Sequence, residues 1–206
     1  MVTYNLSHLT QLDDQAVGGP IQDDEALLLF ALVRVMRLKR ILEVGGLSGY
    51  SAMNFLQAVG PEGTVFTVDI DPVPTLAPNH IVIQKNVEEL TSHELGHDPI
   101  DLLFFDCHVY DAQMKALERL QSAGLVVDET VIALHDTNLH PKQFASWAYP
   151  VEDGWVHQAV ERKMVNDLKG LGYEVIPFHT KMDAHDDSFP YRHGVTIARK
   201  FKQLSL

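Results

Sequence analysis

Apolar and polar positions along the chain group into blocks that predict helices and strands in turn. Residues 23–38 open with acidic side chains and are then apolar on nearly every side, which indicates a mostly buried helix. A short apolar run at 40–44 predicts a buried strand, and a helix is expected after it at 49–59. Further strands are expected at 64–71, 80–84, 100–106 and 130–136, with a helix at 110–124 that ends at Gly124.

The last third of the chain predicts one more helix and two closing strands. Five apolar residues recur there at three- and four-residue intervals and would share one helix face: Val156, Val160, Met164, Leu168 and Leu171. Strands are expected at 173–178 and 193–200, joined by a polar loop at 179–194. Alternating strands and helices predict an α/β fold, a parallel sheet with helices on both faces. We expect a single domain over 1–206, with 1–20 as an N-terminal extension.

Charge and composition narrow the classes of protein. Sixteen Lys and Arg residues against 28 Asp and Glu give a formal net charge of -12, which would repel a phosphate backbone, so nucleic acid is not an expected partner. No apolar run approaches the roughly 20 residues that span a bilayer, and the N-terminus lacks the pattern of a signal peptide. The single cysteine, Cys107, allows no internal disulfide. We therefore expect a soluble, cytoplasmic protein without a membrane partner.

The glycines after the first strand indicate a backbone that passes close to another group. They read Gly45-Gly46-Leu47-Ser48-Gly49, so Leu47 stands where a dinucleotide-binding G-x-G-x-x-G motif has its close-approach glycine. A P-loop is excluded because no Gly-Lys-Ser/Thr follows. The pattern suits a ligand with an amino-acid end and a ribose but no pyrophosphate. The alternative is an ordinary turn, since glycines after a strand are common.

An acid at the end of the second predicted strand strengthens the ligand interpretation. Asp69 lies 24 residues beyond Gly45, about where a carboxylate must stand to accept hydrogen bonds from both ribose hydroxyls. A solvated acid in a loop is the alternative, and the combined spacing favours the binding role.

The segments ILEVGGLSGYSA, GPEGTVFTVDID, IDLLFFDCHVY and VIALHDTN together resemble the class I S-adenosylmethionine-dependent methyltransferases. The resemblance is strongest to the small catechol and caffeoyl-CoA O-methyltransferases, and it covers roughly 21–200. It implies a seven-stranded sheet with an antiparallel last strand, and S-adenosylmethionine as cofactor. The residues that would bind the cofactor are Glu43, Gly45, Gly46, Gly49, Tyr50, Ser51, Asp69, Asn86, Val87 and Asp106.

The resemblance also divides these residues among the parts of the cofactor. Glu43 and Gly45 would hold its methionine end, with Ser51 bonded to the carboxylate. Asp69 would bind the ribose, and the segment after the third strand, 85–90, would frame the adenine, although its acids could equally face solvent.

The chemistry is expected at Asp106 and Asp136, at the ends of the fourth and fifth strands. Metal-dependent relatives place an acid at each position and bind Mg²⁺ there, which lowers the pKa of a coordinated hydroxyl. This chain departs from the pattern in two places. Thr137 stands where those enzymes have asparagine, and Val109 stands where catechol-type enzymes carry a catalytic lysine.

His108 is the candidate for the missing base, because a histidine titrates near neutral pH and can accept a substrate proton. His108 and His135 are also weaker candidates for metal ligands, and nitrogen ligands would admit Mn²⁺, Fe²⁺ or Zn²⁺ beside Mg²⁺. Either histidine could instead form an ordinary hydrogen bond to a loop.

The favoured function is a methyltransferase that acts on a hydroxyl of a small-molecule acceptor. The alternatives are an NAD-dependent oxidoreductase, disfavoured by Leu47, and a methyltransferase-like binding protein without turnover, which Val109 and Thr137 leave open. The aromatic residues of the loop at 179–194 would suit a flat acceptor, and its acids a cationic or hydroxyl-rich one. The resemblance further implies a possible homodimer.

Overall fold

The computed structural model describes residues 21, 23–137, 148–151, 154–157, 160–179 and 194–201. The predicted N-terminal extension and most of the predicted loop at 179–194 lie outside this part of the chain, so the single-domain organisation of 1–206 stays a prediction. Among the described residues, no helix is both long and apolar enough to cross a bilayer.

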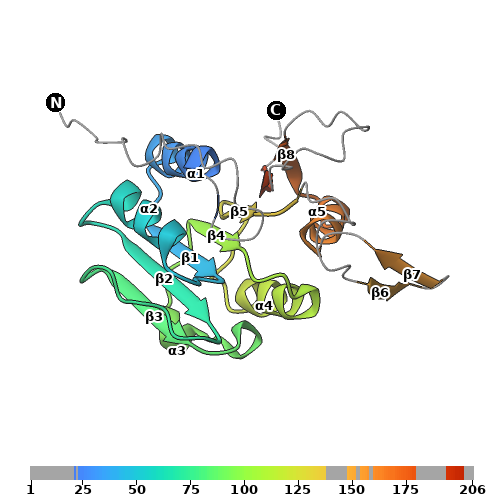
Figure 1. The fold of residues 1–206 in the computed structure, drawn as a ribbon, viewed down its shortest axis with the longest axis horizontal. Helices are drawn as coiled ribbons and strands as arrows, with labels where there is room; N and C mark the ends of the chain where they lie inside the picture. Colours follow the sequence, from blue (N-terminus) through green and yellow to red (C-terminus); the bar gives the residue numbers. More distant parts are fainter. Residues whose placement is uncertain are drawn as a thin grey trace.

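Seven strands form one sheet in the order β3-β2-β1-β4-β5-β9-β8 (Figure 1). The first five are mutually parallel, whereas β9 pairs antiparallel with both β5 and β8. The predicted sheet with an antiparallel last strand is therefore confirmed. The strands are β1 (Arg40–Val44), β2 (Thr64–Asp69), β3 (His80–Gln84), β4 (Leu102–Phe105), β5 (Val131–Leu134), β8 (Glu174–Phe178) and β9 (Val195–Arg199).

Helices cover both faces of the sheet because the side chains of the central strands β1, β4 and β5 are buried alternately toward one face and the other, except for the partly exposed Arg40. On one face, α1 and α2 pack over residues such as Ile41 and Phe104. On the other face, α4 and α5 pack over residues such as Leu42 and Phe105. The helical elements are α1 (Asp23–Met36), α2 (Tyr50–Val59), η2 (Val87–Glu89), α3 (Ser92–Leu95), α4 (Tyr110–Ser122) and α5 (Val160–Gly170).

The predicted helix over Val156–Leu171 was wrong at its start. Val156 belongs to a two-stranded hairpin, β6 (Ala148–Val151) and β7 (Gly154–His157), which Figure 1 shows beyond α5. The helix begins at Val160 and buries Met164 and Leu168 completely, whereas Leu171 follows its end and is half exposed. The apolar periodicity therefore identified the core of α5 but ran past both of its ends.

Candidate active site

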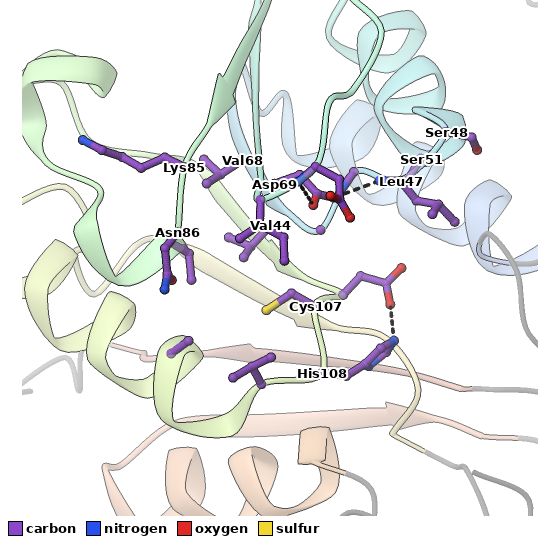
Figure 2. Close-up of a pocket in the computed structure, with 18 of the residues that line it drawn as sticks. Val44, Leu47, Ser48, Ser51, Val68, Asp69, Lys85, Asn86, Cys107 and His108 are labelled. Atoms are coloured by element: carbon purple, nitrogen blue, oxygen red, sulfur yellow. Dashed lines mark hydrogen bonds and ion pairs between the residues drawn. The ribbon is translucent and has the colours of Figure 1, made fainter. Parts of the chain in front are cut away.

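A pocket of about 310 Å³ opens at the carboxyl ends of β1, β2 and β4. The strand order reverses between β1 and β4, and ligands of open α/β sheets bind at such a switch point. Figure 2 shows Lys85 and Asn86 at one end of the pocket, Leu47, Ser48 and Ser51 at the other, and Asp69 between them. The pocket is therefore an elongated site with a carboxylate near its middle.

The turn after β1 needs glycines because other atoms of the protein pack closely against it. Gly45 has a φ of +94°, and a Cβ there would lie 2.4 Å from the carbonyl oxygen of Asp106. A Cβ on Gly46 would lie 2.3 Å from Cγ2 of Thr67. The turn therefore packs directly against the ends of β4 and β2. This packing requires glycine at these positions, in addition to the ligand that we expected.

Asp69 fixes the same turn from the end of β2. Its Oδ2 accepts hydrogen bonds from the backbone N–H groups of Gly46, at 2.7 Å, and Leu47, at 3.1 Å (Figure 2). Its Oδ1 accepts from the N–H of Asp71 at 3.0 Å. These bonds hold the carboxylate at the pocket wall, where a ligand hydroxyl can also reach it.

Glu43 lies beneath the turn and is completely buried. The neutral His80 ring accepts at Nδ1 from the N–H of Leu76, so its proton is assigned to Nε2, which donates to Thr67 Oγ1 at 2.8 Å. The Thr67 hydroxyl in turn donates to Glu43 Oε2 at 2.7 Å. Burial raises the pKa of Glu43 to about 7, although the Ser51 and Thr67 hydroxyls act in the opposite direction.

This buried carboxyl predicts a pH-dependent stability. The folded protein keeps a proton on Glu43 up to about pH 7, whereas the unfolded chain releases it near 4.5, so ionisation favours unfolding. Relative to Glu43→Gln, the wild-type free energy of unfolding should fall by about 3 kcal/mol as the pH rises from 4 to 7. Urea unfolding of both proteins across this range measures the difference. A difference that stays constant with pH would contradict the assignment.

A cluster of carboxylates and imidazoles adjoins the pocket at the ends of β4 and β5. One potential ligand atom from each of Asp106, His108 and Asp136 lies within 4.8 Å of the others. His108 Nε2 is 3.1 Å from Asp136 Oδ2 and 3.6 Å from Asp106 Oδ1. His108 and Asp136 have φ values of +56° and +58°, a conformation that costs energy and is often found at functional sites.

His108 is oriented by Glu161, which the sequence analysis did not identify. Glu161 lies in the first turn of α5, is buried, and its Oε1 is 2.9 Å from His108 Nδ1. Burial alone would lower the pKa of His108, but the bond to Glu161 and the charges of Asp106 and Asp136 outweigh it and raise the pKa to about 9. Without a metal the ring is therefore protonated at neutral pH, which argues against its predicted role as a general base.

His135 has both ring nitrogens engaged by carboxylates. Its Nδ1 is 3.0 Å from Asp106 Oδ1, and its Nε2 is 2.9 Å from Oε2 of the buried Glu25 in α1. Although His135 is buried, the charges of Asp106 and Asp136 and the bond to Glu25 raise its pKa well above the usual value. The weaker prediction that His135 binds a metal is therefore not supported by the geometry, because it has no nitrogen directed at the cluster's open side.

The predicted cofactor residues divide into two groups. Glu43 and Gly49 do not line the pocket, because Glu43 is turned toward Thr67 and Gly49 packs against Leu76. The others line it: Gly45, Gly46, Tyr50, Ser51, Asp69, Asn86, Val87 and Asp106. Several other lining residues were not predicted as cofactor contacts, because nothing in their side-chain types distinguishes them: Leu47, Ser48, Ile70, Cys107 and Val109.

Residues 42–137 match a family model described as a methyltransferase domain. The matched segment runs from β1 to just beyond β5, so it contains the whole pocket together with Asp106, His108 and Asp136. No curated protein matches the chain.

Solved structures with the same fold include three bacterial proteins. The O-methyltransferase TomG from Streptomyces achromogenes, involved in tomaymycin synthesis and solved in complex with SAM, is 19% identical with a TM-score of 0.58, covering 98% of this chain and 92% of that one. A Staphylococcus aureus protein assigned as a caffeoyl-CoA O-methyltransferase is 16% identical with a TM-score of 0.64, covering 97% and 93%. The O-methyltransferase from Bacillus cereus in complex with SAH is 14% identical with a TM-score of 0.56, covering 95% and 90%.

The chain has the sheet order and the switch-point pocket expected of a class I methyltransferase, and its residues 42–137 match a methyltransferase domain. It has the Rossmann-like fold of that class, and the predicted resemblance is confirmed.

Proposed function

We propose that the protein transfers a methyl group from S-adenosylmethionine to a hydroxyl oxygen of a small-molecule acceptor. The observation that carries the proposal is that Asp106 and His108 belong both to the pocket lining and to the cluster with Asp136. A cofactor in the pocket would therefore end beside the groups that handle the acceptor. The solved O-methyltransferases that share the fold support oxygen as the methylated atom.

The pocket suits S-adenosylmethionine in the order of the groups that line it. Asp69 would accept hydrogen bonds from the ribose hydroxyls at the middle. Asn86 and Val87 would frame the adenine at one end, and Gly45, Tyr50 and Ser51 would hold the methionine end. Leu47 disfavours a dinucleotide, because its side chain stands where a pyrophosphate needs a glycine.

The cluster fits a divalent cation. Asp106, His108 and Asp136 offer two carboxylate oxygens and one ring nitrogen, and Glu161 occupies the other ring nitrogen of His108, an arrangement common in metal sites. This donor set accepts Mg²⁺, and the nitrogen admits Mn²⁺, Fe²⁺ or Zn²⁺. A cation held there would lower the pKa of an acceptor hydroxyl.

The rate of methyl transfer depends mainly on how the acceptor and the cofactor are positioned. The acceptor oxygen attacks the methyl carbon, the new C–O bond forms as the C–S bond breaks, and the electron pair stays on sulfur. The hydroxyl proton leaves to solvent, because His108, once oriented by Glu161 toward the two aspartates, is not placed to accept it. The chain's contribution is to hold both reactants in line and to exclude water.

Calorimetric titration with S-adenosylhomocysteine, with NAD in a parallel run, tests the proposal. We expect micromolar binding of the former alone, and a loss of about a hundredfold in Asp69→Ala, because the ribose hydroxyls lose a charged acceptor. Asp71→Ala removes a neighbouring carboxylate at the same pocket rim and is the matched control. Binding of NAD alone would favour the oxidoreductase alternative.

The homodimer that the sequence resemblance implies stays a prediction.

A further inference from the structure

A second, smaller cavity of about 140 Å³ lies between α5 and the pair β8 and β9. Its volume is below the several hundred Å³ of pockets that enclose whole ligands, so it has room for one chemical group of a larger molecule. The cavity begins at Thr137, the residue directly after Asp136. It therefore lies next to the proposed reaction centre, and it shares no lining residue with the cofactor pocket.

Cationic and hydrogen-bonding groups gather around this cavity. Arg162 and Lys169 come from one face of α5, with Asn166 between them, and His179 follows β8. No carboxylate lines the cavity among the residues that the structure describes, although acids outnumber cations by 28 to 16 in the whole chain. The sign of the charge here is therefore opposite to that of the chain as a whole.

Arg162 and His179 both contact Thr137 at the edge of this cavity. Burial, followed by the charge of Arg162, lowers the pKa of His179, so the guanidinium lies close enough to the ring to repel a proton from it. An anion between the two groups would offset the charge of Arg162 and so favour protonation of His179. Val165 and Val175 give the cavity an apolar wall beside these polar groups.

The remaining contacts hold the cavity in a fixed position relative to the reaction centre. Arg162 Nε donates to the carbonyl oxygen of Thr137 at 3.2 Å. The buried hydroxyl of Thr137 lies 2.8 Å from His179 Nε2 and accepts from Thr196 at 2.8 Å. Glu161, the preceding residue of α5, contacts His108. One turn of helix thus reaches both the metal-ligand cluster and the cavity.

We propose that this cavity binds an anionic group of the acceptor, a carboxylate or a phosphate, while the acceptor hydroxyl lies at Asp106 and Asp136. The inference rests on the proposed function and adds the class of substrate. It differs from the expectation drawn from the acids of the loop at 179–194, which favoured a cationic or hydroxyl-rich acceptor.

The first experiment measures anion binding alone. Inorganic phosphate is titrated at constant ionic strength into the full-length protein, saturated with S-adenosylhomocysteine, and followed by NMR at the ring protons of His179. We expect saturable binding that is weakened about tenfold in Arg162→Gln and in Lys169→Gln, since each removes a charge-assisted contact. Arg119→Gln, an exposed arginine of α4, should bind as the wild type does. Shifts that do not saturate, or equal affinity in all four proteins, would overturn the proposal.

The second experiment asks whether the anion belongs to the acceptor. Catechol and 3,4-dihydroxybenzoate differ only in a carboxylate, and the latter should bind about tenfold more tightly, with the advantage lost in Arg162→Gln and reduced by phosphate. Phosphate that binds without competing would show an anion site unconnected with the acceptor. If S-adenosylhomocysteine fails to bind, the proposed function fails, whereas the phosphate titration of the unliganded protein still decides whether the cavity takes anions.

Discussion

Asp136→Asn is expected to lose methyl transfer by at least about a hundredfold while its affinity for S-adenosylhomocysteine stays within about threefold. Asp136 belongs to the proposed metal site with Asp106 and His108 but does not line the pocket proposed for the cofactor, so the two functions should separate. Asparagine is the suitable replacement because it tolerates the φ of +58° at this position.

Three measurements together decide this prediction. Transfer from radiolabelled S-adenosylmethionine to a set of vicinal diols gives the activity, calorimetry gives the cofactor affinity, and electron paramagnetic resonance gives Mn²⁺ binding. Asp98→Asn, at an exposed position, is the control for loss of one carboxylate. Wild-type transfer by Asp136→Asn, with no response to a chelator, would exclude the metal-assisted mechanism. Loss of both transfer and cofactor binding would indicate that the buried cluster is needed for folding.

Gly45→Ala is expected to destabilise the protein by about 4 kcal/mol or more, a large fraction of a typical folding free energy. The new Cβ would lie 2.4 Å from the Asp106 carbonyl oxygen, and neither the turn nor the end of β4 can move without breaking the register of the sheet. The φ of +94° adds its own cost.

Gly124→Ala separates these two costs. Gly124 also has a positive φ, of +70°, but a Cβ there meets nothing within 4 Å. It should lose only about 1 kcal/mol, which is the backbone contribution. Urea unfolding of the three proteins measures both values. Similar losses in the two variants would show that the turn yields to the extra atom, and the close packing of Gly45 would then not explain the glycine.

The candidate site was predictable from sequence wherever it lies at strand ends. Parallel strands bring their carboxyl ends to one edge of a sheet, so Asp69, Asp106 and Asp136 could be grouped as soon as the strands before them were recognised. The role of Gly45 was harder to predict. Its glycine pattern indicates a close approach, but only the structure shows that the Asp106 backbone is the group approached.

Glu25 and Glu161 could not be predicted, because their partners are distant in the sequence. Glu161 contacts His108 across 53 positions, and Glu25 contacts His135 across 110. Each acid stands near the start of a helix, where an acidic side chain is ordinary and gives no signal of a tertiary partner. The spacing of apolar residues also could not show where α5 begins, because an apolar residue of the preceding hairpin happens to fall at the same interval.

The long-range contacts of Glu25 also bear on the order of folding. Its Oε1 accepts from the N–H of Gly194, so one side chain joins α1, the end of β5 and the start of β9, across separations of up to 169 residues. Closing such long loops is slow and becomes favourable only after the intervening strands have paired. We therefore expect the contacts of Glu25 and His135 to form late in folding, so that a partly folded chain with a formed β1–β4 core would have the pocket before the proposed metal site.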